Sequence, residues 1–422
     1  MSDTTSARMK KILLVHETFG RLAGAEQNIL VTAPHLREAF GLACLYWKRS
    51  GRDEASFEAL FPEVAQVDFD GPADAVRQAV GAALARINPD LVYVHKCVSI
   101  PVLDALVESG RPLVRMEHDH DIYCMRSYKY FPWSRRICLK KAGLCCVFPC
   151  LASIKRDRSR GRFGLQWVDY RRQMRCIDLS RQFTAQFVVT HYMRDELIRQ
   201  GFPPERIFIF PPIPAPTAVT FSSSFSGRNL IVFAGQIIRG KGLDVLLRSL
   251  ALCKAPFELA VLGSGSHQAY CEALTRELKL QDRVRFHGFV SFDKMADLYR
   301  EATLVAVPSV WPEPIATIGL EVLRYGLPVV GFDAGGIRDW LKDGQTGFLV
   351  PWMDVPAMAA RIDELLTDKD KARRLGTQGR DFVNREYAFE PYVARMKKVF
   401  LTLMEGRVPV CENGDTGVSG RA

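Results

Sequence analysis

The sequence predicts an α/β protein of two doubly wound, parallel-sheet domains that face each other across a cleft. Three observations predict this fold class. The chain has 422 residues, which is room for about two to four domains with separate cores. Short apolar runs rich in β-branched residues alternate with longer segments of helical period, as in a parallel sheet covered by helices. A Pro-rich segment at residues 211–216 interrupts this alternation, which then starts again.

The first domain is predicted to span residues 1–210. Its strands are expected at residues 11–16, 42–47, 91–95, 112–117, 187–190 and 207–210. Its helices are expected at residues 25–39, 73–87 and 167–181, with a further helix that ends at residue 200. The Asn-Pro pair at residues 88–89 marks the end of the second helix, because the residue before proline disfavours helical geometry. An insertion rich in Cys, Arg and aromatic residues, at about residues 120–165, follows the fourth strand.

The second domain is predicted at residues 229–388, after a Pro- and Ser-rich linker at residues 211–228. Its strands are expected at residues 230–234, 258–262, 283–287, 304–307, 328–332 and 348–350. For the helix at residues 389–405 the sequence leaves open whether it stays with this domain or crosses back to the first. The Gly-rich tail at residues 406–422 is predicted to be disordered. Ligands of doubly wound sheets bind outside the carboxyl ends of the strands, so the site is expected in the cleft.

The composition narrows the class of protein. With 48% hydrophobic and 25% charged residues, the chain is neither fibrous nor disordered throughout. No uncharged apolar run reaches the roughly 18 residues that a transmembrane helix needs, and the first apolar run is too short for a secretory signal. The odd number of cysteines, 11, favours a reducing compartment over a disulfide framework. We therefore expect a cytoplasmic protein, at most peripheral on the inner face of the plasma membrane.

The positive charge is concentrated in one segment. Of the net charge of +10, residues 126–175 supply fourteen basic residues against two acidic ones, so the rest of the chain is slightly acidic. Aromatic residues are interleaved with these basic residues. Such a pattern suits an anionic membrane surface or a nucleic acid, and a solvated basic face is the alternative.

Two glutamates mark the strongest candidate site. Glu313 lies in the Pro-rich loop after the strand at residues 304–307, and Glu321 lies within the helix that follows. Both can face a ligand bound above the start of that helix, where unpaired backbone N–H groups suit a phosphate. This stretch resembles the E-x7-E signature of family 4 of the retaining glycosyltransferases. Four further motifs of that family have counterparts here in the same order, at residues 24–26, 118–124, 235–242 and 335–347.

The resemblance covers residues 11 to about 405 and implies the GT-B fold. It also implies transfer of a sugar from a UDP- or GDP-sugar to an acceptor hydroxyl, with retention of configuration and without a metal or other cofactor. In this family pattern Glu321 binds the ribose, Glu313 binds the donor sugar, and Lys241 neutralises the pyrophosphate. Gly319, inside the two-glutamate motif, is also assigned to donor binding.

One departure from the family concerns the loop after the first strand of the second domain. The family's arginine is Gln236 here, which can donate hydrogen bonds but carries no charge. Arg239 lies two residues before Lys241 and is the candidate substitute, and a solvated loop arginine is the equally open alternative. We assign both residues to donor binding.

In the first domain, the resemblance assigns three residues to the site. Gly24 opens the first helix and would allow a donor group to approach the backbone. His118 is expected to contact the transferred sugar, and Asp119 to orient its imidazole. His16 and His95 also end strands and are expected to line the wall of the site. The resemblance implies a front-face reaction, in which the leaving phosphate takes the acceptor proton, with no side-chain nucleophile.

The insertion allows two interpretations of its cysteines. The candidate ligands are Cys124, Cys138, Cys145, Cys146 and Cys150. Thiolates favour zinc and iron–sulfur clusters, but the spacing matches no pair of C-x2-C motifs, and reduced cysteines that fill space are the favoured alternative.

The basic and aromatic residues of the insertion are expected to bind a glycan or lipid-linked acceptor, or the anionic membrane that holds it. A helix at residues 167–181 on that surface is the testable form of this hypothesis. The sequence thus predicts a glycosyltransferase of glycan or cell-envelope polysaccharide biosynthesis. The rival hypothesis is a non-catalytic scaffold of the same fold whose insertion binds metal or nucleic acid, and nucleic acid is the less favoured partner.

Overall fold

A computed structural model describes residues 8–21, 24–131, 133–156, 165–213, 223–225 and 228–409. The chain divides into two compact units. Unit 1 consists of Met1–Ser127, Lys140–Ile213 and Phe389–Ala422, and unit 2 of Tyr128–Leu139 and Pro214–Ala388. Most of the predicted linker and of the predicted disordered tail lies outside the described residues.

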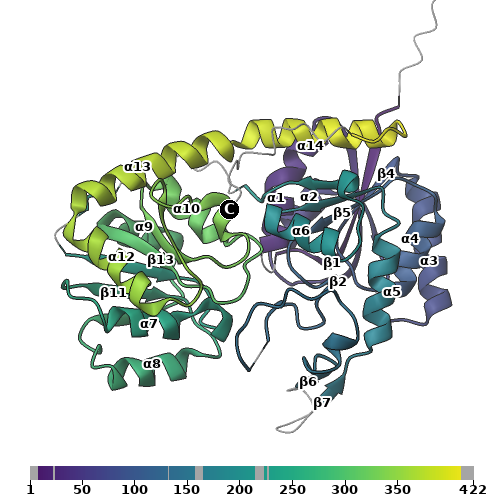
Figure 1. The fold of residues 1–422 in the computed structure, drawn as a ribbon. Coiled ribbons are helices and arrows are strands. Elements are labelled where there is room, and N and C mark those ends of the chain that lie inside the picture. The colour runs from purple at the N-terminus through teal and green to yellow at the C-terminus, as the bar shows by residue number, and fades with distance from the viewer. Residues whose placement is uncertain are drawn as a thin grey trace, which may run out of the picture. The chain divides into compact units, whose positions relative to one another are not determined.

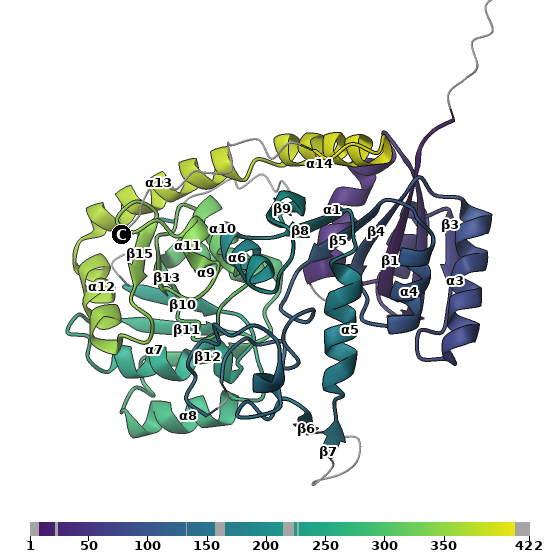
Figure 2. The same cartoon turned by 45° about the vertical axis from the view of Figure 1, so that its right-hand side comes forward.

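Unit 1 is built on a seven-stranded parallel sheet of order β3-β2-β1-β4-β5-β8-β9 (Figure 1). The strands are β1 (Lys11–Phe19), β2 (Gly41–Arg49), β3 (Glu63–Gln66), β4 (Leu91–Lys96), β5 (Leu113–Glu117), β8 (Ala185–Val188) and β9 (Ile207–Ile209). The helices are α1 (Gly24–Arg37), α2 (Glu54–Leu60), α3 (Ala73–Ile87), α4 (Ile100–Glu108), α5 (Tyr170–Ser180), α6 (His191–Arg199) and α14 (Phe389–Met404). Helices α3, α4 and α5 pack side by side on one face, and α1 and α14 lie on the other (Figure 2).

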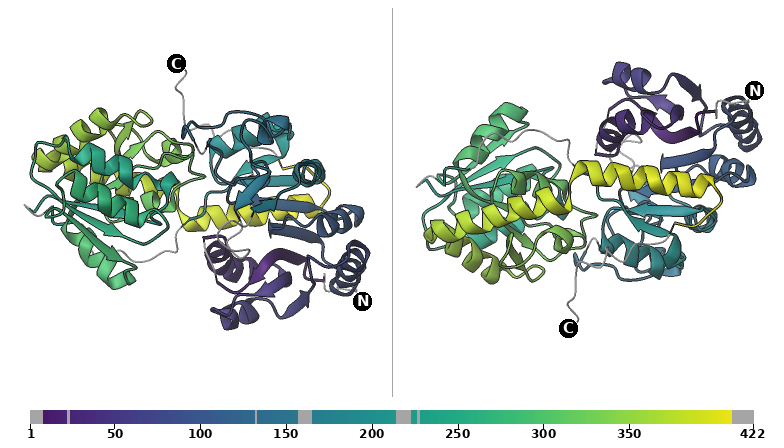
Figure 3. Two further views of the ribbon diagram at one scale, coloured as in Figure 1. Left: turned by 90° about the horizontal axis from the view of Figure 1, so that it is seen from below. Right: turned by 90° about the horizontal axis from the view of Figure 1, so that it is seen from above.

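The last helix, α14, packs on unit 1. The ring of Phe400 lies 5.1 Å from that of Tyr93 and 5.7 Å from that of Phe187, and these two rings come from β4 and β8. At the rim of this contact, Lys397 Nζ is 2.8 Å from Glu38 Oε2. The sequence did not decide which domain this helix packs on. In the structure it completes the core of unit 1, and it is drawn in yellow in Figure 3.

Unit 2 repeats the same architecture with a six-stranded parallel sheet of order β12-β11-β10-β13-β14-β15. The strands are β10 (Leu230–Ala234), β11 (Glu258–Leu262), β12 (Val284–Gly288), β13 (Ala302–Val307), β14 (Val329–Phe332) and β15 (Gly347–Val350). The helices are α7 (Leu243–Leu250), α8 (Gln268–Glu277), α9 (Phe292–Glu301), α10 (Thr317–Arg324), α11 (Ile337–Trp340), α12 (Val355–Thr367) and α13 (Lys369–Glu386). Apart from the edge strand β12, its strands are nearly continuous buried apolar runs, as expected for a parallel sheet with helices on both faces. Two Rossmann-like α/β units were predicted, and this prediction is confirmed.

The insertion after β5 is shared between the units, which corrects the predicted first domain of residues 1–210. Residues 128–139 belong to unit 2, because Arg135 and Tyr128 contact that unit. The following residues return to unit 1 and form a short 3-10 turn at Leu144–Cys146. An antiparallel hairpin of β6 (Ile154–Arg156) and β7 (Leu165–Trp167) comes next. No described helix is long and apolar enough to span a membrane.

Candidate functional site

In unit 2, two loops meet at the carboxyl edge of the sheet. They follow the adjacent parallel strands β10 and β13, so they emerge side by side. Backbone N–H groups of Val310 and Trp311 donate to Gly240 O at 2.8 and 3.2 Å. Gly242 has φ 70°, and a Cβ there would lie 1.9 Å from Pro308 O, so the close approach of the loops requires glycine.

Glu313 is held at the junction of these loops. Its Oε1 accepts from Lys241 Nζ at 2.7 Å, from Ser309 Oγ at 2.5 Å and from Trp311 Nε1 at 2.7 Å. The side chain is almost fully buried, and its backbone is also tied, since Glu313 N donates to Ala334 O at 3.1 Å. The carboxylate therefore has a fixed position. Lys241 keeps 24% of its side chain exposed, so its ammonium group faces both the carboxylate and solvent.

Glu321 lies one turn inside α10, the helix that follows the loop carrying Glu313. Its Oε1 is buried and has no hydrogen-bond partner among the described residues. Burial raises the pKa of this carboxyl group, and the nearby Arg324 charge partly opposes that rise. A buried acceptor oxygen without a protein partner is satisfied when a ligand donates to it, for example through a hydroxyl group.

Gly319 has a packing role in α10. A Cβ at this position would lie 2.1 Å from Trp340 Cη2, so the helix rests directly on the indole ring. The ring is itself fixed, because Trp340 Nε1 donates to Ile315 O at 2.5 Å. Packing against Trp340 thus explains why glycine is needed at this position without any ligand. The assignment of Gly319 to donor binding stays a prediction.

Gln236 and Arg239 lie in the loop between β10 and α7, and both side chains are exposed. The Arg239 charge is close enough to contribute to the lowered pKa of His267, whose main cause is burial. The role of Gln236 and Arg239 in donor binding stays a prediction.

The segment Tyr128–Leu139 borders the loops of unit 2. This contact was not predicted from the sequence. Arg135 forms a bidentate ion pair with Asp244 of α7, at 3.3 and 2.7 Å, and both side chains are largely buried. The Tyr128 ring lies 5.3 Å from the ring of Trp311, whose N–H holds Glu313. The paired residues are 109 positions apart, and no local pattern in the sequence signals such a contact.

In unit 1, three histidines gather at the carboxyl edge of the sheet. His16 lies in β1, His95 in β4, and His118 directly follows β5, and these three strands are neighbours. His95 Nδ1 and His118 Nε2 are 3.0 Å apart, and the two rings are stacked at 5.2 Å. His16 Nε2 is 3.4 Å from Glu26 Oε1. His95 is therefore more than a wall residue, because it fixes the ring of His118.

Burial keeps these imidazoles neutral. It lowers the pKa of His16 to about 4 and that of His118 to about 3, and the pKa of His95 also lies well below its ordinary value. His16 Nδ1 accepts the N–H of Thr18 at 2.9 Å, so the neutral ring carries its proton on Nε2, toward Glu26. At neutral pH the cluster offers hydrogen bonds to a ligand and no positive charge.

Asp119 does not orient His118, which corrects that hypothesis. Its Oδ1 accepts the N–H of Asp121 at 2.9 Å, and its Oδ2 is 3.7 Å from Lys96 Nζ. Burial, together with the Asp121 charge, raises the pKa of Asp119 to about 6. The imidazole is positioned by His95 instead, because the two rings share the carboxyl edge of adjacent strands.

Gly24 is the first residue of α1. A Cβ at this position would meet no atom within 4 Å, and its φ is not in the left-handed region. The described fold therefore does not require glycine there. The assignment of Gly24 to donor binding depends on the resemblance alone and stays a prediction.

The neutral state of the histidine cluster can be tested by NMR. Between pH 8 and pH 5 the ring C–H resonances of His118 and His16 are expected to stay constant, because their pKa values of about 3 and about 4 lie below this range. In urea all histidines should instead titrate near pH 6.5. Spectra of His118→Gln and His16→Gln provide the assignments. A midpoint above pH 6 for either residue in the folded protein would contradict the geometry of the cluster.

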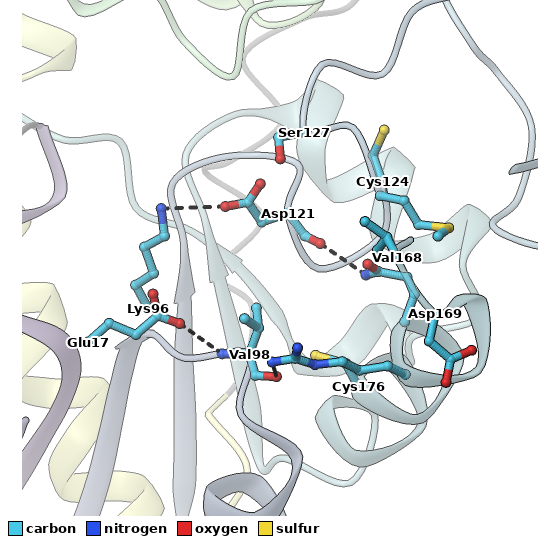
Figure 4. Close-up of a pocket in the computed structure, with 12 residues that line it drawn as sticks. Glu17, Lys96, Val98, Asp121, Cys124, Ser127, Val168, Asp169 and Cys176 are labelled. Carbon is cyan, nitrogen blue, oxygen red and sulfur yellow. Dashed lines mark hydrogen bonds and ion pairs between the residues drawn. The ribbon is translucent and has the colours of Figure 1, made fainter. Parts of the chain in front are cut away.

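A pocket of about 320 Å³ lies beside this cluster, within unit 1 (Figure 4). Its polar lining residues are Glu17, Lys96, Asp121, Ser127, Asp169, Arg172 and Gln173. Glu17 Oε1 accepts the N–H of Val98 at 3.2 Å, and Lys96 Nζ is 3.4 Å from Asp121 Oδ2. Three carboxylates and two cations in so small a volume offer many acceptors and donors with little net charge. This lining suits a polyhydroxylated ligand better than a phosphate.

The candidate cysteines form no ligand set. All five are half-buried, and Cys138 belongs to unit 2 whereas the other four belong to unit 1. Within the described residues, no group of three or more His, Cys, Asp or Glu side chains is placed to hold a metal ion. Burial raises the pKa of Cys146 to about 11, and the neighbouring Cys145 and Cys124 add to that rise. The structure thus gives the proposed zinc or iron–sulfur site no support among the described residues, and that assignment stays a prediction.

Comparison with known proteins identifies the fold and finds relatives for part of the chain. Residues 218–382, which include Lys241, Glu313 and Glu321, match the family described as Glycosyl transferases group 1. Anabaena HepE, solved in complex with UDP, superposes with a TM-score of 0.68 at 18% identity and covers 94% of this chain and 100% of its own. The fold is thus that of the GT-B glycosyltransferases.

Curated relatives resemble part of the chain. The D-inositol 3-phosphate glycosyltransferase of Xylanimonas cellulosilytica is 31% identical over 49% of this chain and 54% of its own length. A GDP-mannose-dependent phosphatidylinositol monomannoside mannosyltransferase of Mycobacterium tuberculosis is 25% identical over 40% of this chain and 46% of its own. The chain spans about half the length of the curated relatives that it matches.

Proposed function

We propose that this protein is a retaining glycosyltransferase that moves a sugar from a nucleoside-diphosphate donor to an acceptor hydroxyl. The observation that carries the proposal is the fixed Lys241–Glu313 pair, together with the unpartnered oxygen of Glu321 one turn inside the following helix, α10. A cation, a bound carboxylate and an open hydrogen-bond acceptor at one sheet edge match the chemistry of a diphosphate, a sugar and a ribose.

Each group has a distinct part in this proposal. The Lys241 ammonium offsets the charge that the diphosphate gains as it leaves. Glu313, already aligned by Ser309 and Trp311, accepts hydrogen bonds from hydroxyls of the donor sugar. Glu321 accepts from the ribose hydroxyls, which satisfies its buried oxygen. No metal or other cofactor is needed for these roles, because the cation is supplied by the chain.

The transfer step balances without a side-chain nucleophile. The bond between the anomeric carbon and the diphosphate oxygen breaks, and its electron pair goes to the diphosphate. The acceptor oxygen bonds to the anomeric carbon on the same face, which retains configuration. The acceptor proton goes to the leaving phosphate oxygen. We retain His118 as the neutral contact to the transferred sugar, since His95 holds its ring.

The acceptor is proposed to be a glycan or a lipid-linked glycan. The pocket beside the histidine cluster supports a polyhydroxylated acceptor, because carboxylates and amides bind sugar hydroxyls. The rival hypothesis of a non-catalytic scaffold is less favoured. If the insertion of such a scaffold bound a metal, a set of ligands would be expected, and none is present among the described residues. In addition, the loops of unit 2 lie in the segment that matches a family of glycosyl transferases.

Thermal unfolding tests donor binding directly. UDP-glucose, UDP-N-acetylglucosamine and GDP-mannose are added to the intact protein, and one nucleotide class is expected to raise Tm. At a concentration of about 100 times Kd the stabilisation is about 2.7 kcal/mol, which for a chain of this size is a shift of roughly 3 °C.

Variants test which residues are responsible for the rise in Tm. Glu321→Gln and Lys241→Ala are expected to reduce the Tm shift by more than half, whereas Lys254→Ala, an exposed lysine of the same unit, should retain it. If none of the three donors changes Tm at millimolar concentration, the proposed function is wrong. If Lys241→Ala retains the full shift, the donor diphosphate lies elsewhere.

A further inference from the structure

Exposed apolar side chains are concentrated in the insertion. Of fifteen large hydrophobic side chains that are exposed in the described residues, nine lie between residues 128 and 167. Six of these nine belong to unit 1, and we call them the apolar tip. They are Leu144, Phe148, Leu151, Ile154, Leu165 and Trp167. Phe148 and Trp167 are 76% and 68% exposed, which is unusual for aromatic side chains of a folded domain.

Backbone hydrogen bonds tie together the turn and the hairpin that carry the apolar tip. Phe148 N donates to Leu144 O at 3.0 Å, so these two side chains project from the same turn. In the hairpin, Ile154 is directly opposite Trp167, and Leu165 is two residues before Trp167, so all three share a face. The N–H of Ala152 donates to Cys146 O at 2.8 Å and joins turn to hairpin.

The hairpin lies at the amino-terminal end of α5 and extends beyond it, as Figures 1 and 2 both show. Helix α5 itself turns its apolar residues inward, with Cys176, Ile177 and Leu179 buried. Its outward residues are polar, and they include Arg171 and Arg175. The surface-bound helix expected at residues 167–181 is therefore not apolar on its outer side, and the apolar tip supplies the exposed apolar surface instead.

Basic residues flank the apolar tip along the chain. The segment from residue 126 to residue 175 has a net charge of +12, whereas the rest of the chain is slightly acidic. Lys141, just before the turn, and Arg171, just after the hairpin, are both exposed. An apolar surface with basic residues at its border complements a bilayer whose headgroups are negative, with aromatic rings at the headgroup level.

We infer that the apolar tip docks on an anionic lipid surface, with Phe148 and Trp167 inserted among the headgroups and Lys141 and Arg171 paired with lipid phosphates. The hydrophobic contact and the charge act together, since one apolar anchor alone gives weak, reversible binding. The inference is independent of the proposed sugar transfer, because lipid binding requires neither donor nor acceptor.

Vesicle flotation of the full-length protein tests this inference. Vesicles of phosphatidylglycerol and phosphatidylcholine are compared with vesicles of phosphatidylcholine alone, at 0.1 M and 0.5 M salt and without nucleotide. Binding is expected to anionic vesicles at least about tenfold more strongly than to neutral ones, and to weaken at high salt. No binding to anionic vesicles, or equal binding to both compositions, would overturn the inference.

Three variants separate the contributions. Phe148→Ser with Trp167→Ser, and separately Lys141→Ser with Arg171→Ser, are each expected to lower vesicle binding at least about tenfold. Leu252→Ser removes a side chain that is 53% exposed in unit 2 and should leave binding unchanged. Tm and circular dichroism verify that the variants fold. If the Phe148 and Trp167 changes leave flotation intact, or instead abolish a dimer detected by sedimentation, the tip contacts protein and the inference fails.

Discussion

Replacing Glu313 by Ala is expected to lower kcat/KM for sugar transfer by about 10²–10³-fold, the loss typical of removing one placed electrostatic group. The change deprives three donors of their shared acceptor, namely Lys241, Ser309 and Trp311. Lys241 then has no fixed partner, and its ammonium is free to leave the position in which it would meet the diphosphate. Release of nucleoside diphosphate from the donor that raises Tm measures the rate.

Two further variants make this result specific. Glu313→Gln retains an oxygen that accepts from Ser309 and Trp311 but removes the negative charge opposite Lys241, so an intermediate rate is expected. Glu277→Ala, an exposed carboxylate of the same unit, should transfer at the original rate. Full activity of Glu313→Ala with an unchanged fold would show that the reacting sugar does not bind at this loop junction.

Gly319→Ala is expected to lower the free energy of unfolding by about 1–3 kcal/mol, the usual cost of overpacking a core. The new methyl group would overlap the Trp340 ring, and the ring cannot simply move away because its N–H is bonded to Ile315 O. Displacement of either α10 or Trp340 would also disturb the helix that carries Glu321. Chemical unfolding followed by tryptophan fluorescence measures the change.

Gly81→Ala is the matched control. Gly81 also lies inside a helix, α3, but a Cβ there would meet no atom within 4 Å. Because alanine favours a helix over glycine by about 1 kcal/mol, this variant should be as stable as the original protein or slightly more stable. Equal stability of Gly319→Ala and Gly81→Ala would contradict the close contact between α10 and Trp340.

Much of the fold could be predicted from periodicity, and the failures have physical reasons. Strands such as β1, β10 and β13 are buried on both faces, so their sequences are short apolar runs that stand out. Strand β3, Glu63–Gln66, was missed because it is a four-residue edge strand without a strong apolar signal. Helix α4 was missed because its short apolar sequence has no clear helical period.

The candidate site likewise has residues that could be predicted from the sequence and residues that could not. Lys241, Glu313 and Glu321 could be identified because they belong to motifs in a fixed order along the chain. The Arg135–Asp244 pair could not, because it joins segments that only the folded chain brings together. The contact between His95 and His118 could not be predicted either. Both residues could be placed at the ends of strands, but they meet only because β4 and β5 are neighbours in the sheet, and the strand order is visible only in the structure.

The division of the chain between the two units has a consequence for its synthesis. Unit 1 is assembled from three separate segments and unit 2 from two, so neither unit is one continuous stretch. The rings of Tyr93 and Phe187 remain uncovered until α14, near the end of the chain, has left the ribosome. Unit 2 in turn takes in Tyr128–Leu139 from the first half. A fragment that stops at residue 388 should therefore expose the apolar surface of unit 1 that α14 covers, including the rings of Tyr93 and Phe187.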